Sequence, residues 1–468
     1  MGDNFRKRED RKDLVKQFEE QLKNKIYIFY DIETYEEIID YYLDHGNFKK
    51  ALRACNIAID QYPYSTELLV EKAQILFNTE DYDRALELLN KAGEMQPTDP
   101  EIRLLKGTIY SLQGLRAEAI EEYTQALAFT EEKDECYYNI GLVYQTESNY
   151  EEAIKYYKMA IEYNINHEGA LYELAFCLDM TGELESSLSY YQKFIDQDPY
   201  SFYAWYNLGI VLSKLERYDE AIKAYEYATL IEEDFASAWF NMGNTYMTIG
   251  KFTQALDSYR KTYEYEGPSA EIFCSMGMAY EKLCQHDLAI KYFRKAIKID
   301  HHYDEAWFGI GQNLFLQERY YESIHFLSRA VKLNDTNEVY WHTLAKAEYR
   351  TGNFVSSIEA YQKACELDPT DIDMWLNWSL IYYDQGDYEK ALEIVNKALE
   401  ESPDEADLYY RASAYLVAAG KYKKAINYLE NALSLNFDRH ALWLDFFPKL
   451  ETQNALAKII DQYRKKKK

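Results

Sequence analysis

The hydrophobic positions between residues 202 and 235 have the spacing of two short amphipathic helices. Apolar and small side chains recur at i, i+3, i+4 and i+7 in each half, which places them on one face of a helix. The first face comprises Trp205, Leu208, Gly209 and Leu212, and the second comprises Tyr218, Ala221, Ile222, Tyr225 and Ala228. A short turn at residues 215–217 separates the two faces. This stretch therefore predicts a hairpin of two helices, each with one buried face.

The same pattern recurs every 34 residues. If Phe202 is position 1 of the unit, position 20 is alanine or serine in twelve consecutive units without an insertion. These residues are Ala51, Ala85, Ala119, Ala153, Ser187, Ala221, Ala255, Ala289, Ser323, Ser357, Ala391 and Ala425. A fixed period of this length is the signature of a solenoid, in which each unit buries its apolar face against its neighbours. We therefore predict one continuous array rather than several globular domains.

Other positions of the unit indicate how the hairpin closes. Position 15 is glycine in seven units, where a left-handed residue can end the first helix. Position 8 is glycine in six units, and we expect the two helices to approach closely there. Position 4 is tryptophan in five units, and we expect these large rings to fill the space beside the small residues. The tryptophans are Trp205, Trp239, Trp307, Trp341 and Trp375.

The unit resembles the tetratricopeptide repeat, whose pattern is W-x2-L-G-x2-Y…A-x3-F…A…P. The seventh unit matches it at Trp239, Met242, Gly243, Tyr246, Ala255 and Tyr259. Single units depart from the pattern, as at Ile39 and Glu348. The resemblance covers residues 32–439. It implies an all-α fold, a right-handed α–α superhelical solenoid of twelve tandem repeats.

The segments on either side of the repeats are expected to cover the open ends of the solenoid. Residues 1–31 are predicted to form an N-terminal capping helix, because Leu14, Phe18 and Leu22 recur every four residues. Residues 440–468 are predicted to form degenerate C-terminal capping helices and a basic tail. Trp443 falls in frame at position 4, and Pro448 is expected to break or kink the helix.

The charge of the chain limits the classes of partner. The formal net charge is −28, and both flanking segments are slightly basic, so the repeats carry the negative excess. This charge disfavours nucleic acid and anionic membranes and favours basic segments of other proteins. Acidic outer helix faces that keep a long solenoid soluble explain the same charge. Six cysteines without a CxxC pair, and an N-terminus without an apolar run, predict a cytoplasmic chain with reduced thiols.

The sequence contains no motif of catalysis. It has no phosphate-binding loop and no HExxH motif, and the glycines of residues 308–311 lie within a predicted first helix. The pair His301 and His302 falls at a junction between repeats and is interpreted as a surface pair. We therefore expect a protein that is not an enzyme and that needs neither a cofactor nor a metal.

What remains is the surface of the first helices. In the family that the unit resembles, these helices line a concave groove, and rows of asparagine amides there pair with the backbone of an extended peptide. Positions 2, 6, 9 and 13 form one stripe, and position 5 lies beside it. The asparagines are Asn139, Asn207, Asn241 and Asn377 at position 6 and Asn244 at position 9. The row is interrupted at Glu173. These amides could also bind only water or a neighbouring helix.

Two further groups belong to this predicted surface. Aromatic residues occupy position 5 in five units, where their rings could face a ligand or pack between repeats. They are Tyr138, Tyr172, Tyr206, Phe240 and Phe308. In the tenth unit, His342, Lys346 and Arg350 recur every four residues and predict a basic helix face.

The leading hypothesis is a non-enzymatic protein–protein interaction scaffold that binds extended peptide segments in its concave groove. The alternative is a co-chaperone or assembly subunit that binds a basic partner on the acidic convex face.

Overall fold

The computed structural model describes residues 2–24, 26, 29–441, 444 and 454–467, and the described residues contain no strand. The all-α prediction is therefore confirmed for them. Two positions singled out in the sequence, Trp443 and Pro448, lie outside the described residues. The chain divides into two compact units, residues 1–231 and 232–468, and each is considered by itself.

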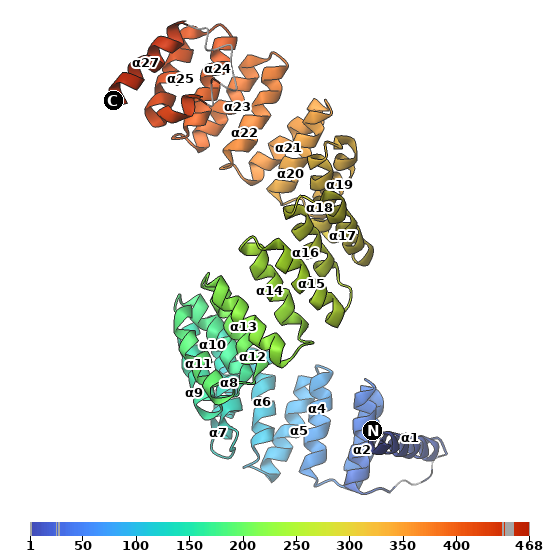
Figure 1. Cartoon of the computed structure of the whole chain (residues 1–468). Helices are drawn as coiled ribbons and strands as arrows, with labels where there is room; N and C mark the ends of the chain where they lie inside the picture. Colours follow the sequence, from blue (N-terminus) through green and yellow to red (C-terminus); the bar gives the residue numbers. More distant parts are fainter. Residues whose placement is uncertain (1, 25, 27–28, 442–443, 445–453, 468) are drawn as a thin grey trace. The chain divides into compact units, whose positions relative to one another are not determined.

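Unit 1 begins with a single helix, α1 (Gly2–Lys23), and continues as six helix hairpins (Figure 1). The hairpins are α2 (Ile32–Asp44) with α3 (Phe48–Gln61), α4 (Thr66–Asn78) with α5 (Tyr82–Met95), α6 (Pro100–Leu112) with α7 (Arg116–Ala126), α8 (Lys133–Thr146) with α9 (Tyr150–Tyr163), α10 (Glu168–Met180) with α11 (Leu188–Gln197), and α12 (Phe202–Lys214) with α13 (Tyr218–Ile231). A short 3₁₀ helix, η1 (Leu184–Ser187), leads into α11.

Unit 2 contains six more hairpins of the same kind. They are α14 (Ala236–Thr248) with α15 (Phe252–Glu266), α16 (Ala270–Lys282) with α17 (His286–Ile299), α18 (Asp304–Leu316) with α19 (Tyr320–Leu333), α20 (Glu338–Arg350) with α21 (Phe354–Leu367), α22 (Ile372–Asp384) with α23 (Tyr388–Glu401), and α24 (Ala406–Ala418) with α25 (Tyr422–Leu435). The 3₁₀ helix η2 (Phe437–Arg439) and the helix α27 (Asn454–Lys467) follow.

Position 15 is left-handed in all twelve hairpins. The seven glycines predicted to end the first helix have φ between 66° and 81°, as Gly46 and Gly352 illustrate, so that prediction is confirmed. The other five hairpins hold a non-glycine residue in the same conformation. These residues are Glu80, Ser148, Glu216, Cys284 and Glu318, with φ from 57° to 62°. The turn therefore sets the backbone conformation, and five residues adopt it against their steric preference.

The glycines at position 8 allow the two helices of a hairpin to approach closely, as predicted. The ring that meets them, however, comes from position 24 of the second helix. A Cβ atom on Gly141 would lie 2.5 Å from Cε1 of Tyr157, and the other position-8 glycines face a ring or a leucine in the same way. This corrects the expectation that the tryptophans at position 4 fill this space.

The tryptophans at position 4 instead fix the loop before their own helix. In all five, the indole Nε1 donates a hydrogen bond to the carbonyl oxygen six residues earlier. The five bonds run from Trp205 to Pro199, from Trp239 to Glu233, from Trp307 to His301, from Trp341 to Asp335 and from Trp375 to Pro369, at 2.8–3.0 Å. Each tryptophan therefore joins the end of one repeat to the start of the next.

The helix α1 packs on the first hairpin. Phe18 is 1% exposed, and its ring meets the ring of Tyr35 edge-on at 6.4 Å and lies tilted at 6.3 Å from the ring of Tyr30. Val15 is also buried, and Leu14 and Leu22 are half-buried against the same cluster. The apolar spacing of the N-terminal segment thus corresponds to a helix with one buried face.

Candidate protein-interaction surface

Within each unit, the first helices of successive hairpins contact one another, as α8 does with α10 and α10 with α12. The second helices of neighbouring hairpins approach one another less closely. The first helices therefore lie on the inner side of the curve of each unit. We call their solvent-facing side chains the inner face.

The inner face of unit 1 carries a row of exposed apolar side chains on one helix. Tyr172, Phe176 and Met180 follow one another every four residues along α10 and are 51%, 38% and 53% exposed. We call these three residues the α10 stripe. Most large apolar residues of this solenoid are buried, so three exposed ones in line on one helix form an unusual surface.

Neighbouring helices extend this surface. Tyr203 on α12 is 40% exposed and its ring lies 4.2 Å from that of Phe202. The ring of Phe176 meets the ring of Tyr150 edge-on at 6.2 Å, which holds the middle of the stripe in place. Polar groups border it, since Glu173 accepts a hydrogen bond from Gln145 at 2.6 Å. The arrangement is an apolar strip with a polar margin.

Sequence reasoning had singled out only Tyr172 from this surface. Phe176, Met180 and Tyr203 occupy positions 9, 13 and 2, which belong to the predicted stripe of the first helices. A signal was available, because the apolar residues of 168–180 outnumber the charged ones and are not confined to one face of the helix. A helix that needs only one buried face then has apolar residues left over for solvent or for a partner.

The asparagines of unit 1 are already engaged or buried. The Nδ2 group of Asn139 donates to the backbone oxygen of Glu135 at 2.8 Å and to its carboxylate at 3.2 Å. Asn207 is only 9% exposed. The bonds of Asn139 lie within its own helix, so they show neither a neighbouring helix nor a peptide as its partner. The contact of these two amides with a peptide stays a prediction.

The asparagines of unit 2 differ from one another. Asn244 is exposed and accepts a hydrogen bond from the Tyr259 hydroxyl at 2.7 Å. Asn241 on α14 and Asn377 on α22 are half-buried. Their contact with a peptide stays a prediction.

The aromatic residues at position 5 mostly pack within the repeats. Tyr206 and Phe240 lie 6.1 and 5.6 Å from the rings at position 24 of their own hairpins, and the ring of Phe308 stacks on that of Tyr340 at 4.5 Å. Tyr138 lies between Tyr157 and His167. Of the five, Tyr172 alone is exposed, and the other four are half-buried.

The predicted basic face of α20 is only partly a surface. His342 is buried, and burial lowers its pKa to about 4, so the imidazole is neutral at pH 7. Burial also lowers the pKa of Lys346, and Asp373 and Asp371 oppose that shift. Arg350 is exposed, and its guanidinium lies 5.5 Å from the ring centroid of Tyr320. The prediction of a basic helix face is therefore corrected at His342, because the ring is desolvated.

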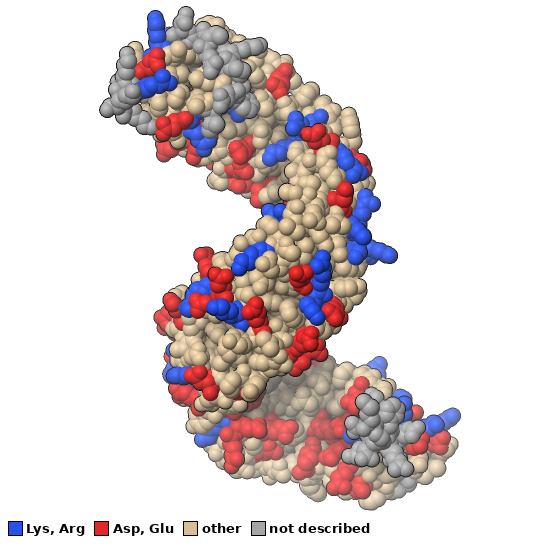
Figure 2. Space-filling model, in the orientation of Figure 1, with Lys and Arg blue, Asp and Glu red and all other residues tan. Residues whose placement is uncertain are grey.

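Acidic side chains gather on the first hairpins of unit 1. Figure 2 shows them as a red area over α4 to α6. Burial and, to a lesser extent, the nearby carboxylates Asp40 and Glu36 raise the pKa of Glu71 on α4 to about 8. Like charges that raise one another's pKa are held close without enough cations between them.

The described residues contain one group of three potential metal ligands whose donor atoms lie within 4.8 Å of one another, namely Asp300, His301 and His302. All three are exposed. This agrees with the interpretation of the histidine pair as a surface pair. Among the described helices, none has both the length and the apolar character needed to cross a bilayer.

Comparison with known proteins identifies the repeats. Family models described as tetratricopeptide repeat match residues 42–109, 135–167, 169–201, 190–223, 236–266, 270–303, 339–371 and 371–436, and a model described as TPR repeat matches residues 211–250. The array of helix hairpins and its inner face define an α-solenoid. The chain belongs to the tetratricopeptide-repeat family, which generally provides non-catalytic scaffolds for protein interaction.

Similar proteins cover different parts of the chain. The TPR repeat-containing protein YpiA of Bacillus subtilis (strain 168) is 29% identical over 92 residues, which are 20% of this chain and 22% of that protein. Among solved structures, the Cut9–Hcn1 hetero-tetramer of the APC/C is 16% identical, with a TM-score of 0.38 over 85% of this chain and 96% of that one. YrrB, described as a TPR protein with an unusual peptide-binding site, is 20% identical, with a TM-score of 0.34 over 39% of this chain and 94% of that one.

Proposed function

We propose that this protein is a non-enzymatic scaffold that binds an extended segment of another protein on the inner face of unit 1. The segment places apolar side chains on the α10 stripe and Tyr203. The observation that carries this proposal is the exposure of Tyr172, Phe176 and Met180 in one line along one helix. An extended segment suits the surface because the stripe is long and narrow and follows one helix.

The energetics favour such a ligand. Complete burial of a large apolar side chain contributes about 1.5–3 kcal/mol, so covering three half-exposed ones contributes on the order of 1 kcal/mol each. The helices satisfy their own backbone groups, so side chains must supply the recognition. Glu173 and Asn139 lie at the polar margin, and their carbonyl or carboxylate oxygens can accept hydrogen bonds from the backbone amides of the segment.

The test is a peptide-display selection on the immobilised full chain, followed by affinity measurement of the selected peptides. The variant Tyr172→Ser, Phe176→Ser, Met180→Ser should weaken binding at least tenfold. A matched control changes Tyr64, Tyr321 and Val355 to serine, since these apolar residues are exposed but lie away from the inner face. Equal binding by both variants and the wild type would reject the inner face as the site.

The acidic surface supports a second candidate function, the binding of a basic partner segment. Its support is the acidic area over α4 to α6 in Figure 2 and the closeness of Glu36 and Asp40 on α2. Affinity that falls steeply between 50 and 300 mM salt, and that the α10 stripe variant leaves unchanged, would favour this function over the first.

A further inference from the structure

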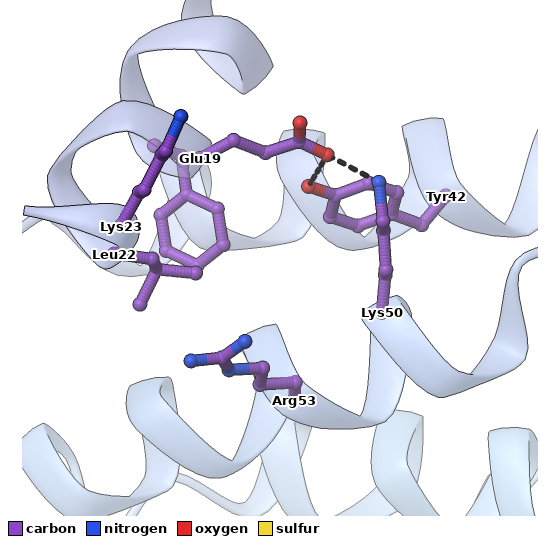
Figure 3. Close-up of a pocket in the computed structure, with 7 residues that line it drawn as sticks. Glu19, Leu22, Lys23, Tyr42, Lys50 and Arg53 are labelled. Carbon is purple, nitrogen blue, oxygen red and sulfur yellow. Dashed lines mark hydrogen bonds and ion pairs between the residues drawn. The ribbon is translucent and has the colours of Figure 1, made fainter.

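A pocket of about 350 Å³ lies where α1 crosses the first hairpin (Figure 3). The last turns of α1 supply Phe18, Glu19, Leu22 and Lys23, while Tyr42 comes from α2 and Lys50 and Arg53 come from α3. The volume lies at the lower end of the range of small-ligand sites, about 300–1,000 Å³. The pocket is separate from the α10 stripe and from the cluster around Glu71.

The floor of the pocket is apolar and well ordered by packing. Phe18 and Tyr42 are 1% and 4% exposed, and Leu22 is half-buried beside them. The Tyr42 hydroxyl, the one polar group of this side chain, donates a hydrogen bond to Oε1 of Glu19 at the rim of the pocket, at 3.0 Å. A flat apolar group can therefore rest on this floor without leaving a polar atom unpaired.

The rim of the pocket is cationic in a strongly acidic protein. Three cations and one carboxylate line it. Lys50 pairs with Glu19 at 2.5 Å, and this hydrogen bond lowers the pKa of the Glu19 carboxyl. Among the described residues, no carboxylate lies within ion-pair distance of Lys23 or Arg53. The pocket therefore has an excess of two positive charges.

Figure 3 shows how these groups are separated. Glu19, Tyr42 and Lys50 form one hydrogen-bonded group, and Arg53 lies apart from it, across the space below Leu22. The N–H donors of the Arg53 guanidinium therefore remain available to a ligand. A forked donor of this kind suits a carboxylate or a phosphate, which it can bind through two parallel hydrogen bonds.

We propose that this pocket binds an anionic group carried on a short apolar stem, such as an aryl phosphate. The stem lies on Leu22 and on the edges of Phe18 and Tyr42, and the anion lies on the guanidinium of Arg53, while Lys23 adds positive charge at the other end of the pocket. Such a group occurs both in free small molecules and in phosphorylated aromatic side chains of other proteins, and the chemistry of recognition is shared.

The experiment measures binding of phenyl phosphate to the full chain by methyl NMR of Leu22, with inorganic phosphate and benzyl alcohol as probes of each half of the ligand. We expect phenyl phosphate to shift the Leu22 methyl resonances and to bind at least fivefold more tightly than either half. A short peptide with one phosphotyrosine distinguishes the sources. Binding of the peptide as tight as that of phenyl phosphate indicates a partner's side chain, and exclusion of the peptide indicates a free small molecule.

Variants identify the residues responsible. Arg53→Gln should weaken phenyl phosphate binding at least threefold, and Arg53→Gln with Lys23→Gln should remove it. Lys49→Gln is the matched control, because Lys49 is exposed on the same helix and does not line the pocket. These side chains are exposed, so circular dichroism should show all variants folded. No shift of the Leu22 methyls, equal binding of inorganic phosphate, or an equal effect of Lys49→Gln would each overturn the proposal.

Discussion

The ring of Tyr225 lies so close to Gly209 that a Cβ atom on the glycine would be 2.5 Å from ring Cε1. Three other hairpins repeat this pairing of position 8 with a tyrosine at position 24, and the remaining two glycines meet Phe293 and Leu327. Side chains almost never approach so closely, so a Cβ atom at position 209 would require the Tyr225 ring to shift. The tight closure of the hairpin therefore depends on two residues that are 16 positions apart.

The first prediction concerns this pairing. Gly209→Ala should destabilise the sixth hairpin by on the order of 1–3 kcal/mol, because the buried Tyr225 ring has little room to move. Gly93→Ala is the control, since its Cβ atom would meet only Ile102, at 3.7 Å, and alanine favours a helix by up to about 1 kcal/mol. Hydrogen exchange should show faster opening of α12 and α13 in Gly209→Ala. It should show no faster opening of α4 and α5 in Gly93→Ala. Equal effects of both changes would contradict the steric explanation.

The sequence predicted the hairpins and their period because local spacing determines which face of a short helix is buried. It also predicted the left-handed turn at position 15 from glycine. It could not predict that Glu216 adopts the same conformation, because the packing of both helices imposes it. The aromatic partner of Gly209 was misassigned to position 4 because a one-dimensional pattern does not tell which ring reaches the glycine.

The candidate surface was less predictable than the fold. Position alone does not distinguish Tyr172, which is exposed, from Tyr206, which packs on Tyr225. The difference depends on how each helix is rotated against its neighbours. Helix rotation also explains why the burial of Asn207 and His342 could not be predicted, since their polar side chains suggested positions in contact with solvent.

The second prediction concerns the strained turns. Glu216 has φ of 59°, and its side chain is exposed, so it contributes little packing that could be lost. Glu216→Gly should stabilise the hairpin by about 0.5–1 kcal/mol, because glycine adopts a left-handed conformation without steric cost. Gly420→Ala should act in the opposite direction, since φ there is 72°. Urea unfolding of both variants, followed by local hydrogen exchange, measures whether each change raises or lowers the free energy of unfolding.

The third prediction is that the two units respond oppositely to pH. In unit 1, the Glu71 carboxyl has a pKa raised to about 8, first by burial and then by Asp40 and Glu36. The folded state therefore holds a proton that the unfolded chain loses near pH 4.5, and stability falls as pH rises from 4.5 to 8. Glu71→Gln should stabilise α4 at pH 8 by on the order of 2–3 kcal/mol, and this gain should shrink at pH 5. Hydrogen exchange, corrected for intrinsic rates, measures it.

In unit 2, His342 should give the reverse slope. Burial and Lys346 lower its pKa to about 4, although Asp371 and Asp373 act in the other direction. The unfolded chain binds a proton near pH 6.5, whereas the folded state keeps His342 neutral down to about pH 4. The contribution of neutral His342 to the free energy of unfolding is therefore complete above pH 6.5 and is lost as the pH falls toward 4. Between pH 7.5 and pH 5, α20 should lose on the order of 2 kcal/mol of protection, and His342→Phe should remove this dependence while keeping a ring beside Tyr361. Slopes of the same sign in α4 and α20 would show that net charge, and not these two buried groups, sets the response to pH.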